Sequence, residues 1–249
     1  MSRTVLIAAM EREVGLLVRG WQRSTLAAGQ RSFVVFEKDE LVVVVSGIGK
    51  KNAEQAAHAA AGQYRPAQLV SAGLAGALIR SLKVGSVVTP NVVVEAESGA
   101  EYRTATAAGS IGGGILITAD SVAGIPAKQK LVERLHGLVV DMEAAGVAKV
   151  AQAEHIAFRC VKAISDEAEF AMPPLAQFMD ADGNFHTARF ALWTALRPWR
   201  WATVVALGSN SRRATKALCQ WLEKDLEARG PRADVVTLNR EEFSEARMK

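Results

Sequence analysis

Short runs of β-branched and other apolar residues alternate, along the first 170 positions, with alanine-rich stretches of helical composition. This alternation is typical of a sheet with parallel strands covered by helices. We therefore expect an α/β fold with a central, mixed, twisted sheet flanked by helices in three layers. The runs expected to form strands are residues 5–8, 33–37, 41–46, 69–72, 115–118, 138–140 and 157–164, with one or two more within 84–94.

Helices are expected over residues 51–64 and 142–155, and a helix also opens at residues 10–13. After Pro173 and Pro174 the composition shifts to basic, tryptophan-bearing helices, with breaks expected at Pro198 and around residues 208–211. The glycine-rich segment 104–114 is predicted to be a mobile loop. We expect residues 1–232 to form one domain, with 169–232 as a helical addition, and 233–249 to be a polar tail.

The composition is that of a globular protein that does not span a membrane. Of its 249 residues 49% are hydrophobic, which excludes disorder for most of the chain. No stretch reaches the roughly 18 apolar residues of a membrane span, and the start does not have the pattern of a signal peptide. Two cysteines, Cys160 and Cys219, are too few for a disulfide scaffold or a four-cysteine zinc site. These features predict a cytoplasmic protein.

The net charge of +4 is concentrated near the end of the chain. From Arg189 to Arg232 the sequence has nine basic residues and three acidic ones, and four of the five tryptophans lie in the same stretch. Tryptophans interleaved with arginines suit a membrane interface, which makes peripheral membrane contact one hypothesis. The same residues could equally pack the helices on the sheet or on a second subunit and form a solvated face. Nucleic-acid binding is not expected, because no base-reading motif is present.

Polar residues follow several of the expected strands, where ligands of open α/β sheets gather. The segments are residues 11–13, 46–50, 141–143 and 165–167, and three of them carry carboxylates. One acid, one base and one group that orients hydroxyls are what glycosidic or acyl chemistry needs. Any one of these acids is also explained by the preference for carboxylates in the first turn of a helix. The four histidines show no metal-ligand spacing, and we expect no metal and no organic cofactor.

Five motifs together resemble the nucleoside phosphorylase and nucleosidase superfamily, and most closely its methylthioadenosine/S-adenosylhomocysteine nucleosidases. They are AAMEREVGLL at 8–17, VVVSGIGKKNAEQAA at 43–57, SAGLAGALIRSLKVGSVV at 71–88, VDMEAAGVAKVA at 140–151 and VKAISDEAE at 161–169. The resemblance implies the phosphorylase/hydrolase-like fold, a purine nucleoside as the substrate, and a homo-oligomer.

The resemblance also assigns roles, residue by residue. Glu13 orients or deprotonates the attacking water. Met142 packs on the ribose, and Glu143 holds its 2′- and 3′-hydroxyls. Asp166, held partly protonated and oriented by Ser165, protonates the leaving purine. A further substrate contact falls on Gly73 of the third motif.

Two positions differ from the family pattern. Lys162 stands where the nucleosidases usually have arginine, and it is expected to contact the water and Glu13 through one donor. Val122 or Ala123 stands where an aromatic side chain often stacks on adenine.

The resemblance favours hydrolysis over phosphorolysis. Met10 to Glu13 replace the Gly-Asp-Pro-x-Arg segment with which hexameric phosphorylases bind phosphate, and two acids there would repel phosphate. The chain is thus expected to release adenine from a 5′-substituted nucleoside. The alternatives are a phosphate-dependent purine nucleoside phosphorylase and a nucleoside-binding protein without catalysis.

A second, looser resemblance concerns residues 170–222, with Met172-Pro173-Pro174, Asp182-Gly183, Leu196-Arg197-Pro198 and Ser211-Arg212-Arg213-Ala214. This stretch is similar to the hopanoid-associated subgroup of the superfamily, which is thought to remove adenine from an adenosylated triterpenoid. It implies a lipid as one candidate for the 5′ substituent, beside a small sulfur-linked group.

Overall fold

The computed structural model describes residues 3–105, 113–178, 180 and 185–228, and the side chains among them except that of residue 176. Its strands are β1 (Thr4–Ala8), β2 (Gln22–Ala28), β3 (Arg31–Lys38), β4 (Leu41–Val45), β5 (Gln68–Ala77), β6 (Val87–Val88), β7 (Val92–Glu95), β8 (Glu101–Arg103), β9 (Ile115–Thr118), β10 (Val139–Asp141) and β11 (Ala157–Asp166). The helices are α1 (Glu11–Val14), α2 (Lys50–Tyr64), α3 (Ile125–Leu135), α4 (Ala144–Ala153), α5 (Thr187–Ala195) and α6 (Trp201–Ala228), and 3-10 turns cover Leu175–Phe178 and Pro198–Arg200.

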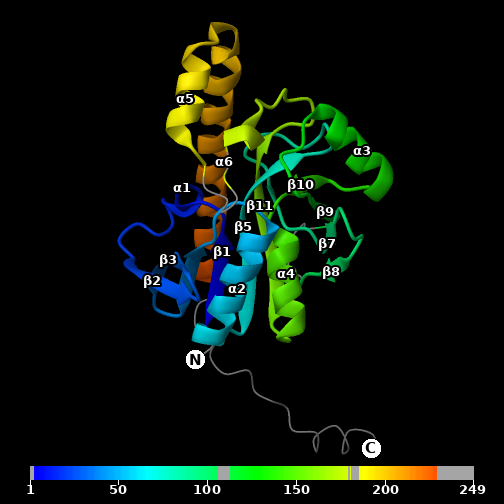
Figure 1. Ribbon diagram of the computed structural model, residues 1–249. Helices are drawn as coiled ribbons and strands as arrows, with labels where there is room; N and C mark the ends of the chain where they lie inside the picture. Colours follow the sequence, from blue (N-terminus) through cyan, green and yellow to red (C-terminus); the bar gives the residue numbers. More distant parts are fainter. Residues whose placement is uncertain (1–2, 106–112, 179, 181–184, 229–249) are drawn as a thin grey trace, which may run out of the picture.

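A mixed sheet forms the centre of the molecule (Figure 1). Its strand order is β2-β3-β4-β1-β5-β10-β9-β7-β8, and β11 pairs with β5 and β6. The long strand β5 runs parallel to β1 on one side and to β11 on the other, and its last residues pair antiparallel with β10. Because β1 and β11 both run parallel to β5, their carboxyl ends lie at the same edge of the sheet as the second half of β5.

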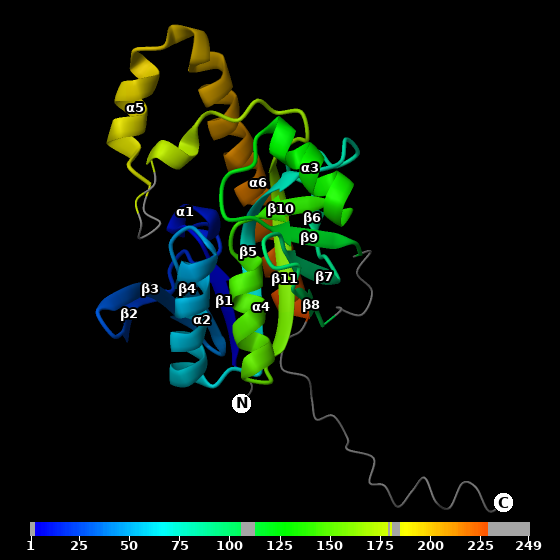
Figure 2. The same cartoon turned by 45° about the vertical axis from the view of Figure 1, so that its right-hand side comes forward.

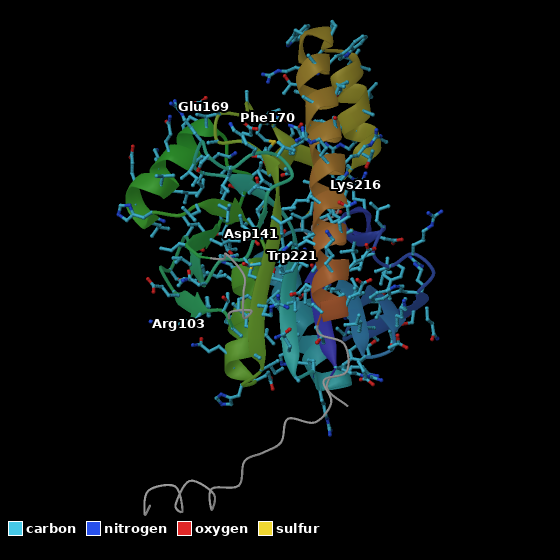
Figure 3. All side chains as sticks on the ribbon, turned by 180° about the vertical axis from the view of Figure 1, so that it is seen from behind. Arg103, Asp141, Glu169, Phe170, Lys216 and Trp221 are labelled. Carbon is cyan, nitrogen blue, oxygen red and sulfur yellow. The ribbon has the colours of Figure 1, made fainter. Side chains whose placement is uncertain are left out.

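Alternating residues of the central strands fill a core on each face of the sheet. Val5 and Ile7 of β1 pack with the alanines of α2 and α4 on one face, and Leu6 and Ala8 pack with α6 on the other. Ala214, Leu218 and Leu222 of α6 contribute most to this second face. Figure 3, a view from behind, shows α6 lying across this face of the sheet, with Lys216 and Trp221 on the helix. The sheet therefore lies between two helical layers, as predicted.

The first half of α6 and all of α5 project past the edge of the sheet as a helical hairpin (Figure 2). Phe178, Phe185, Phe190 and Trp193 form an aromatic cluster at its base, with ring centroids 5.2 Å apart for the Phe178–Phe190 pair. The hairpin thus stands over the carboxyl ends of the strands. Among the described residues, no helix combines the length and the apolar character that crossing a membrane requires.

Most predicted elements are confirmed, and one expected feature is wrong. The chain does break at Pro198, but α6 runs through residues 208–211 without interruption. Most of the glycine-rich segment 104–114 and all of the expected tail 233–249 lie outside the described residues. The structure describes one chain, so the homo-oligomer stays a prediction.

Candidate functional site

A cavity of about 760 Å³ opens where β1, β10 and β11 end, beneath the α5–α6 hairpin. Its wall includes seven of the nine residues that the sequence singled out: Glu13, Val122, Ala123, Met142, Glu143, Ser165 and Asp166. The other two lie next to Glu13: Gly73 is in the second half of β5, and Lys162 is in the second half of β11. The three predicted carboxylates are therefore brought together from separate parts of the chain.

Glu13 is a buried carboxyl group with spare hydrogen-bonding capacity. It accepts a backbone hydrogen bond from Met10, yet its Oε2 atom has no hydrogen-bond partner among the described residues. Gly73 leaves the space that this carboxyl occupies, since a Cβ atom there would lie 3.0 Å from Oε2. Burial, reinforced by the charge of Glu143, raises the pKa of Glu13 to about 8. A buried acceptor of this kind is suited to hold and activate a water molecule.

Lys162 pairs with Asp141 rather than with Glu13. Its Nζ atom lies 2.8 Å from Oδ2 of Asp141, and both side chains are almost fully buried. Asp141 also accepts hydrogen bonds from the Thr118 hydroxyl at 2.7 Å and the Ala144 amide at 2.8 Å. The expected contact of Lys162 with the first-strand acid is thus wrong as a direct bond. Its ammonium acts on Glu13 only through space, where it opposes the rise of the Glu13 pKa.

Glu143, the residue before α4, is held by two backbone amides. Its Oε1 accepts a hydrogen bond from the Gly49 amide at 2.9 Å, and Oε2 accepts one from the Met142 amide at 3.3 Å. Gly49 has a φ of 105°, which side-chain-bearing residues rarely adopt, so the turn that aims this amide depends on glycine. Burial and the nearby charge of Asp141 raise the pKa of Glu143 to about 6. At neutral pH this carboxylate can accept hydrogen bonds from hydroxyl groups.

Asp166 has a partner on each oxygen. The Ser165 hydroxyl donates to Oδ1 at 2.8 Å, as the resemblance implies, and the ammonium of Lys128 lies 2.5 Å from Oδ2. Gly76 makes room for this pair, because a Cβ atom there would lie 2.8 Å from Oδ2 and 3.2 Å from Nζ of Lys128. The partial protonation expected of Asp166 stays a prediction.

Sequence reasoning missed the importance of Asp141 and Lys128. Lys128 occupies a position of α3 where the spacing of Ile125, Leu131, Val132 and Leu135 calls for an apolar side chain, and it is the buried residue of that helix. A charged residue in an apolar stripe was the signal that could have revealed it.

The base-stacking position carries no aromatic side chain, as expected from Val122 and Ala123. Aromatic side chains do reach the cavity from the hairpin, through Phe185 and Phe190. No cluster of three or more His, Cys, Asp or Glu side chains suited to a metal ion occurs in the part of the chain that the structure describes.

Comparison with known proteins identifies one family from the sequence. The sequence model of the Phosphorylase superfamily matches residues 3–108 and 110–195. A 5′-methylthioadenosine/S-adenosylhomocysteine nucleosidase from Geobacillus kaustophilus is 28% identical over 227 residues, which cover 76% of this chain and 95% of the relative.

Two solved structures share the fold. The 5′-methylthioadenosine nucleosidase of Arabidopsis thaliana in its apo form has a TM-score of 0.73 and 19% identity, covering 94% of this chain and 98% of its own. The futalosine hydrolase of Helicobacter pylori has a TM-score of 0.67 and 16% identity, covering 91% and 98%. At these identities the structures support the architecture, and the site must be argued from its own residues.

Proposed function

The chain belongs to the Phosphorylase superfamily, and on that premise we propose that it hydrolyses the N-glycosidic bond of a 5′-substituted adenine nucleoside. The observation that carries the proposal is the meeting of Glu13, Glu143 and Asp166 in one cavity. The matched relatives named as methylthioadenosine/S-adenosylhomocysteine nucleosidases and futalosine hydrolase support the same class of reaction.

Each carboxyl group has a distinct task in this reaction. Breaking the bond to adenine leaves positive charge on the ribose, which the carboxylates of Glu143 and Glu13 stabilise more in the transition state than in the substrate. Glu143 also binds the ribose hydroxyls, with Met142 packed on the sugar. The free Oε2 of Glu13 takes the proton of the attacking water. Asp166 and Ser165 face the purine, which must gain a proton as it leaves.

Hydrolysis is favoured over phosphorolysis by the charges around the expected position of the nucleophile. Glu13 and Glu143 are both close enough for their charges to interact, and the ammonium of Lys162 is already paired with Asp141. An incoming phosphate would be repelled by these carboxyl groups, and among the described residues Arg12 is the cavity-lining cation whose charge reaches Glu13.

The decisive experiment follows adenine release from methylthioadenosine, S-adenosylhomocysteine, adenosine and an adenosine with a 5′-triterpenoid tail, with and without phosphate. We expect phosphate-independent release of adenine and free ribose from at least one 5′-substituted nucleoside. Release that depends on phosphate and yields ribose 1-phosphate would establish the phosphorylase instead. Binding of a nucleoside without any adenine release would establish a binding protein and contradict hydrolysis.

A bulky apolar 5′ substituent, as in an adenosylated hopanoid, suits the upper part of the cavity. Its walls there include the apolar side chains of Met172, Leu175, Phe190, Val204 and Leu207, beside polar ones such as Arg212 of α6. A volume of about 760 Å³ lies in the upper range of pockets for drug-sized ligands. We therefore expect kcat/KM to be higher for the triterpenoid-tailed adenosine than for methylthioadenosine.

The tip of the hairpin is suited to contact with an anionic membrane. Five of its large apolar side chains are more than half exposed: Leu192, Leu196, Trp199, Trp201 and Val205. Between residues 185 and 222 the chain has six lysines and arginines and no acidic residue. Exposed tryptophans beside unopposed arginines match the combination that binds the headgroup region of anionic bilayers. Contact there would bring the cavity close to the membrane that would contain the proposed lipid-linked substrate.

Replacing Trp199 and Trp201 together with serine is expected to lower binding to phosphatidylserine-containing vesicles at least tenfold. These side chains are 72% and 52% exposed and do not line the cavity, so hydrolysis of methylthioadenosine should be unchanged. Vesicle sedimentation measures the binding, with Arg23→Gln on the distant strand β2 as the control. Equal binding of the double variant and the wild type would contradict membrane contact through this hairpin.

A further inference from the structure

Asp141 is a buried acidic residue of the cavity wall to which the proposed reaction gives no task. It is the last residue of β10, and its side chain is shielded from solvent together with that of its partner Lys162. Burying a carboxylate is costly unless it is paired and hydrogen-bonded. The contacts of Asp141 therefore indicate what its burial achieves.

Donors from three elements fix Asp141 in place. The hydroxyl of Thr118, at the end of β9, donates to Oδ1 at 2.7 Å, and the amide of Ala144, at the start of α4, donates to Oδ2 at 2.8 Å. Thr118 is itself fixed, because its oxygen accepts a hydrogen bond from the Ala145 amide at 3.0 Å. The amino end of a helix also favours negative charge. Asp141 is thus a preformed anion, and the ammonium of Lys162 on β11 lies 2.8 Å from it.

Lys162 has a second carboxyl group close by. A Cβ atom at Gly73 would lie 3.0 Å from Oε2 of Glu13 and 3.7 Å from Nζ of Lys162, so both atoms border the same small space. That Oε2 atom has no hydrogen-bond partner in the described part of the chain, although an ammonium has three donors. The Cys160 thiol, also on β11, has a pKa raised by burial to about 12 and offers no competing charge. The ammonium is therefore bonded to the carboxylate that the backbone fixes, and Glu13 is left unbonded on the cavity wall.

This choice of partner matters because a directly paired carboxyl group is a weaker base. An opposite charge in contact lowers the pKa of a carboxyl group by about 1–3 units. Without that contact, burial raises the pKa of Glu13 to about 8, and the charge of Lys162 opposes only part of the rise. A general base works best when its pKa lies near the working pH.

We propose that Asp141 is a positioning residue of the reaction, which holds the Lys162 ammonium off Glu13 and so leaves the Glu13 carboxyl available to accept the proton of the attacking water. This inference rests on the proposed nucleosidase function and names the residue that keeps its base available. The proton passes from water to Glu13, as in the proposed reaction, and Asp141 neither gains nor loses a proton in that step.

The other charges around Glu13 come from several parts of the fold. Glu143, before α4, raises the Glu13 pKa by its charge, whereas Arg12 of α1 and Lys162 lower it. From α6 the thiol of Cys219 lies 3.4 Å from the Glu13 carbonyl oxygen, and burial raises the pKa of that thiol. Because the pKa of Glu143 is about 6, its charge is already present where Glu13 titrates. Lys162 is therefore the charge that a change at position 141 redirects.

Two variants of the pair should move the titration of Glu13 in opposite directions. Asp141→Asn removes the anion that holds Lys162, so the ammonium turns to Glu13, and the rising limb of kcat/KM should move at least one pH unit below its wild-type position near pH 8. The double variant Asp141→Asn/Lys162→Met removes the cation as well, with a side chain of similar volume. Its limb should move above the wild-type position, because the charge that lowers the Glu13 pKa is gone. A pair that served only the fold would leave the limb in place in both variants.

The two signs make the test decisive. A limb that stays near pH 8 in either folded variant, or that moves in the same direction in both, overturns the proposal. If thermal unfolding shows that Asp141→Asn does not fold, the double variant, which leaves no charge of the pair unmatched, decides alone by its shift. Asp225→Asn is the control, because it breaks the pair with Arg159 away from the cavity and should leave the limb unmoved.

Infrared difference spectra separate this inference from the proposed function. Subtracting the spectrum of the Glu13→Gln counterpart from that of each protein isolates the titration of the Glu13 carboxyl without any turnover. The same opposite shifts should appear there, and their absence contradicts the role of Asp141. A wild-type protein that shows the carboxyl titration but releases no adenine would instead contradict the proposed function.

Discussion

Asp166→Asn is expected to lower adenine release by about 10²- to 10⁴-fold. Asparagine keeps one acceptor oxygen and carries no charge, so it cannot pair with the Lys128 ammonium as a carboxylate does while also accepting from Ser165. The loss should appear in kcat more than in KM, because the interaction matters most when the purine departs. Steady-state assays with the nucleoside that the wild type hydrolyses best provide the measurement, and near-normal turnover would refute the assignment.

Loss of stability must be distinguished from loss of catalysis in this variant. Removing one member of a buried ion pair destabilises a protein by about 3 kcal/mol or more, and Asp166 is paired with a buried lysine. The chain offers a matched control in Asp225, which forms a part-buried two-bond pair with Arg159 and does not line the cavity. Asp225→Asn should lower the melting temperature comparably and leave the specific activity of the folded protein unchanged.

The sequence predicted the strands whose apolar side chains pack on both faces of the sheet. It did not reveal β2, in which only Leu26 is buried, because an edge strand of mostly polar residues carries no hydrophobic pattern. The expected break at residues 208–211 failed for a related reason. Glycine, serine and asparagine lower helix propensity by up to about 1 kcal/mol each, but packing of Ala214, Leu218 and Leu222 on the sheet stabilises α6 as a whole. Tertiary contacts of this kind are invisible in a local pattern.

The candidate site was predictable where motifs follow strands and unpredictable where partners come from elsewhere in the chain. Glu13 and Glu143 lie within five residues of the end of a strand and Asp166 is the last residue of one, so the common edge of the sheet was enough to bring them together. The partners of the ionised groups depend on distances across the fold. Lys162 pairs with Asp141 and Lys128 with Asp166, which are contacts between residues 21 and 38 positions apart in the sequence. Only the three-dimensional arrangement decides which cation lies against which carboxylate.

Glu13→Gln is expected to lower kcat by about 10²- to 10⁴-fold and to remove one limb of the pH profile. The group must be a carboxylate to take a proton from water, and its pKa is raised to about 8, chiefly by burial. The wild-type kcat/KM should therefore rise about tenfold per pH unit between about pH 6, where Glu143 ionises, and pH 8, and level off above pH 8. The glutamine variant, which has no proton to lose, should show a flat residual rate over the same range.

The same substitution should change stability in a direction that depends on pH. In the folded protein Glu13 keeps its proton up to about pH 8, whereas in the unfolded chain it loses the proton near 4.5. The folded state thus binds more protons between these values, and wild-type stability falls as pH rises through that window. Glutamine does not titrate. The free energy of unfolding of Glu13→Gln, relative to that of the wild type, should therefore be higher at pH 8 than at pH 5 by at least about 1 kcal/mol.

Glu11→Gln provides the control for both effects, because it removes a carboxyl from the same helix, where Glu11 is exposed and pairs only loosely with Arg23 at 3.4 Å. Its activity, pH profile and stability should match those of the wild type. A variant at Glu13 that loses activity while becoming relatively more stable at high pH would identify a group whose burial serves catalysis at the expense of stability. If Glu13→Gln instead loses stability and activity together at every pH, the carboxyl is part of the folding core, and the water at C1′ must be activated by another residue.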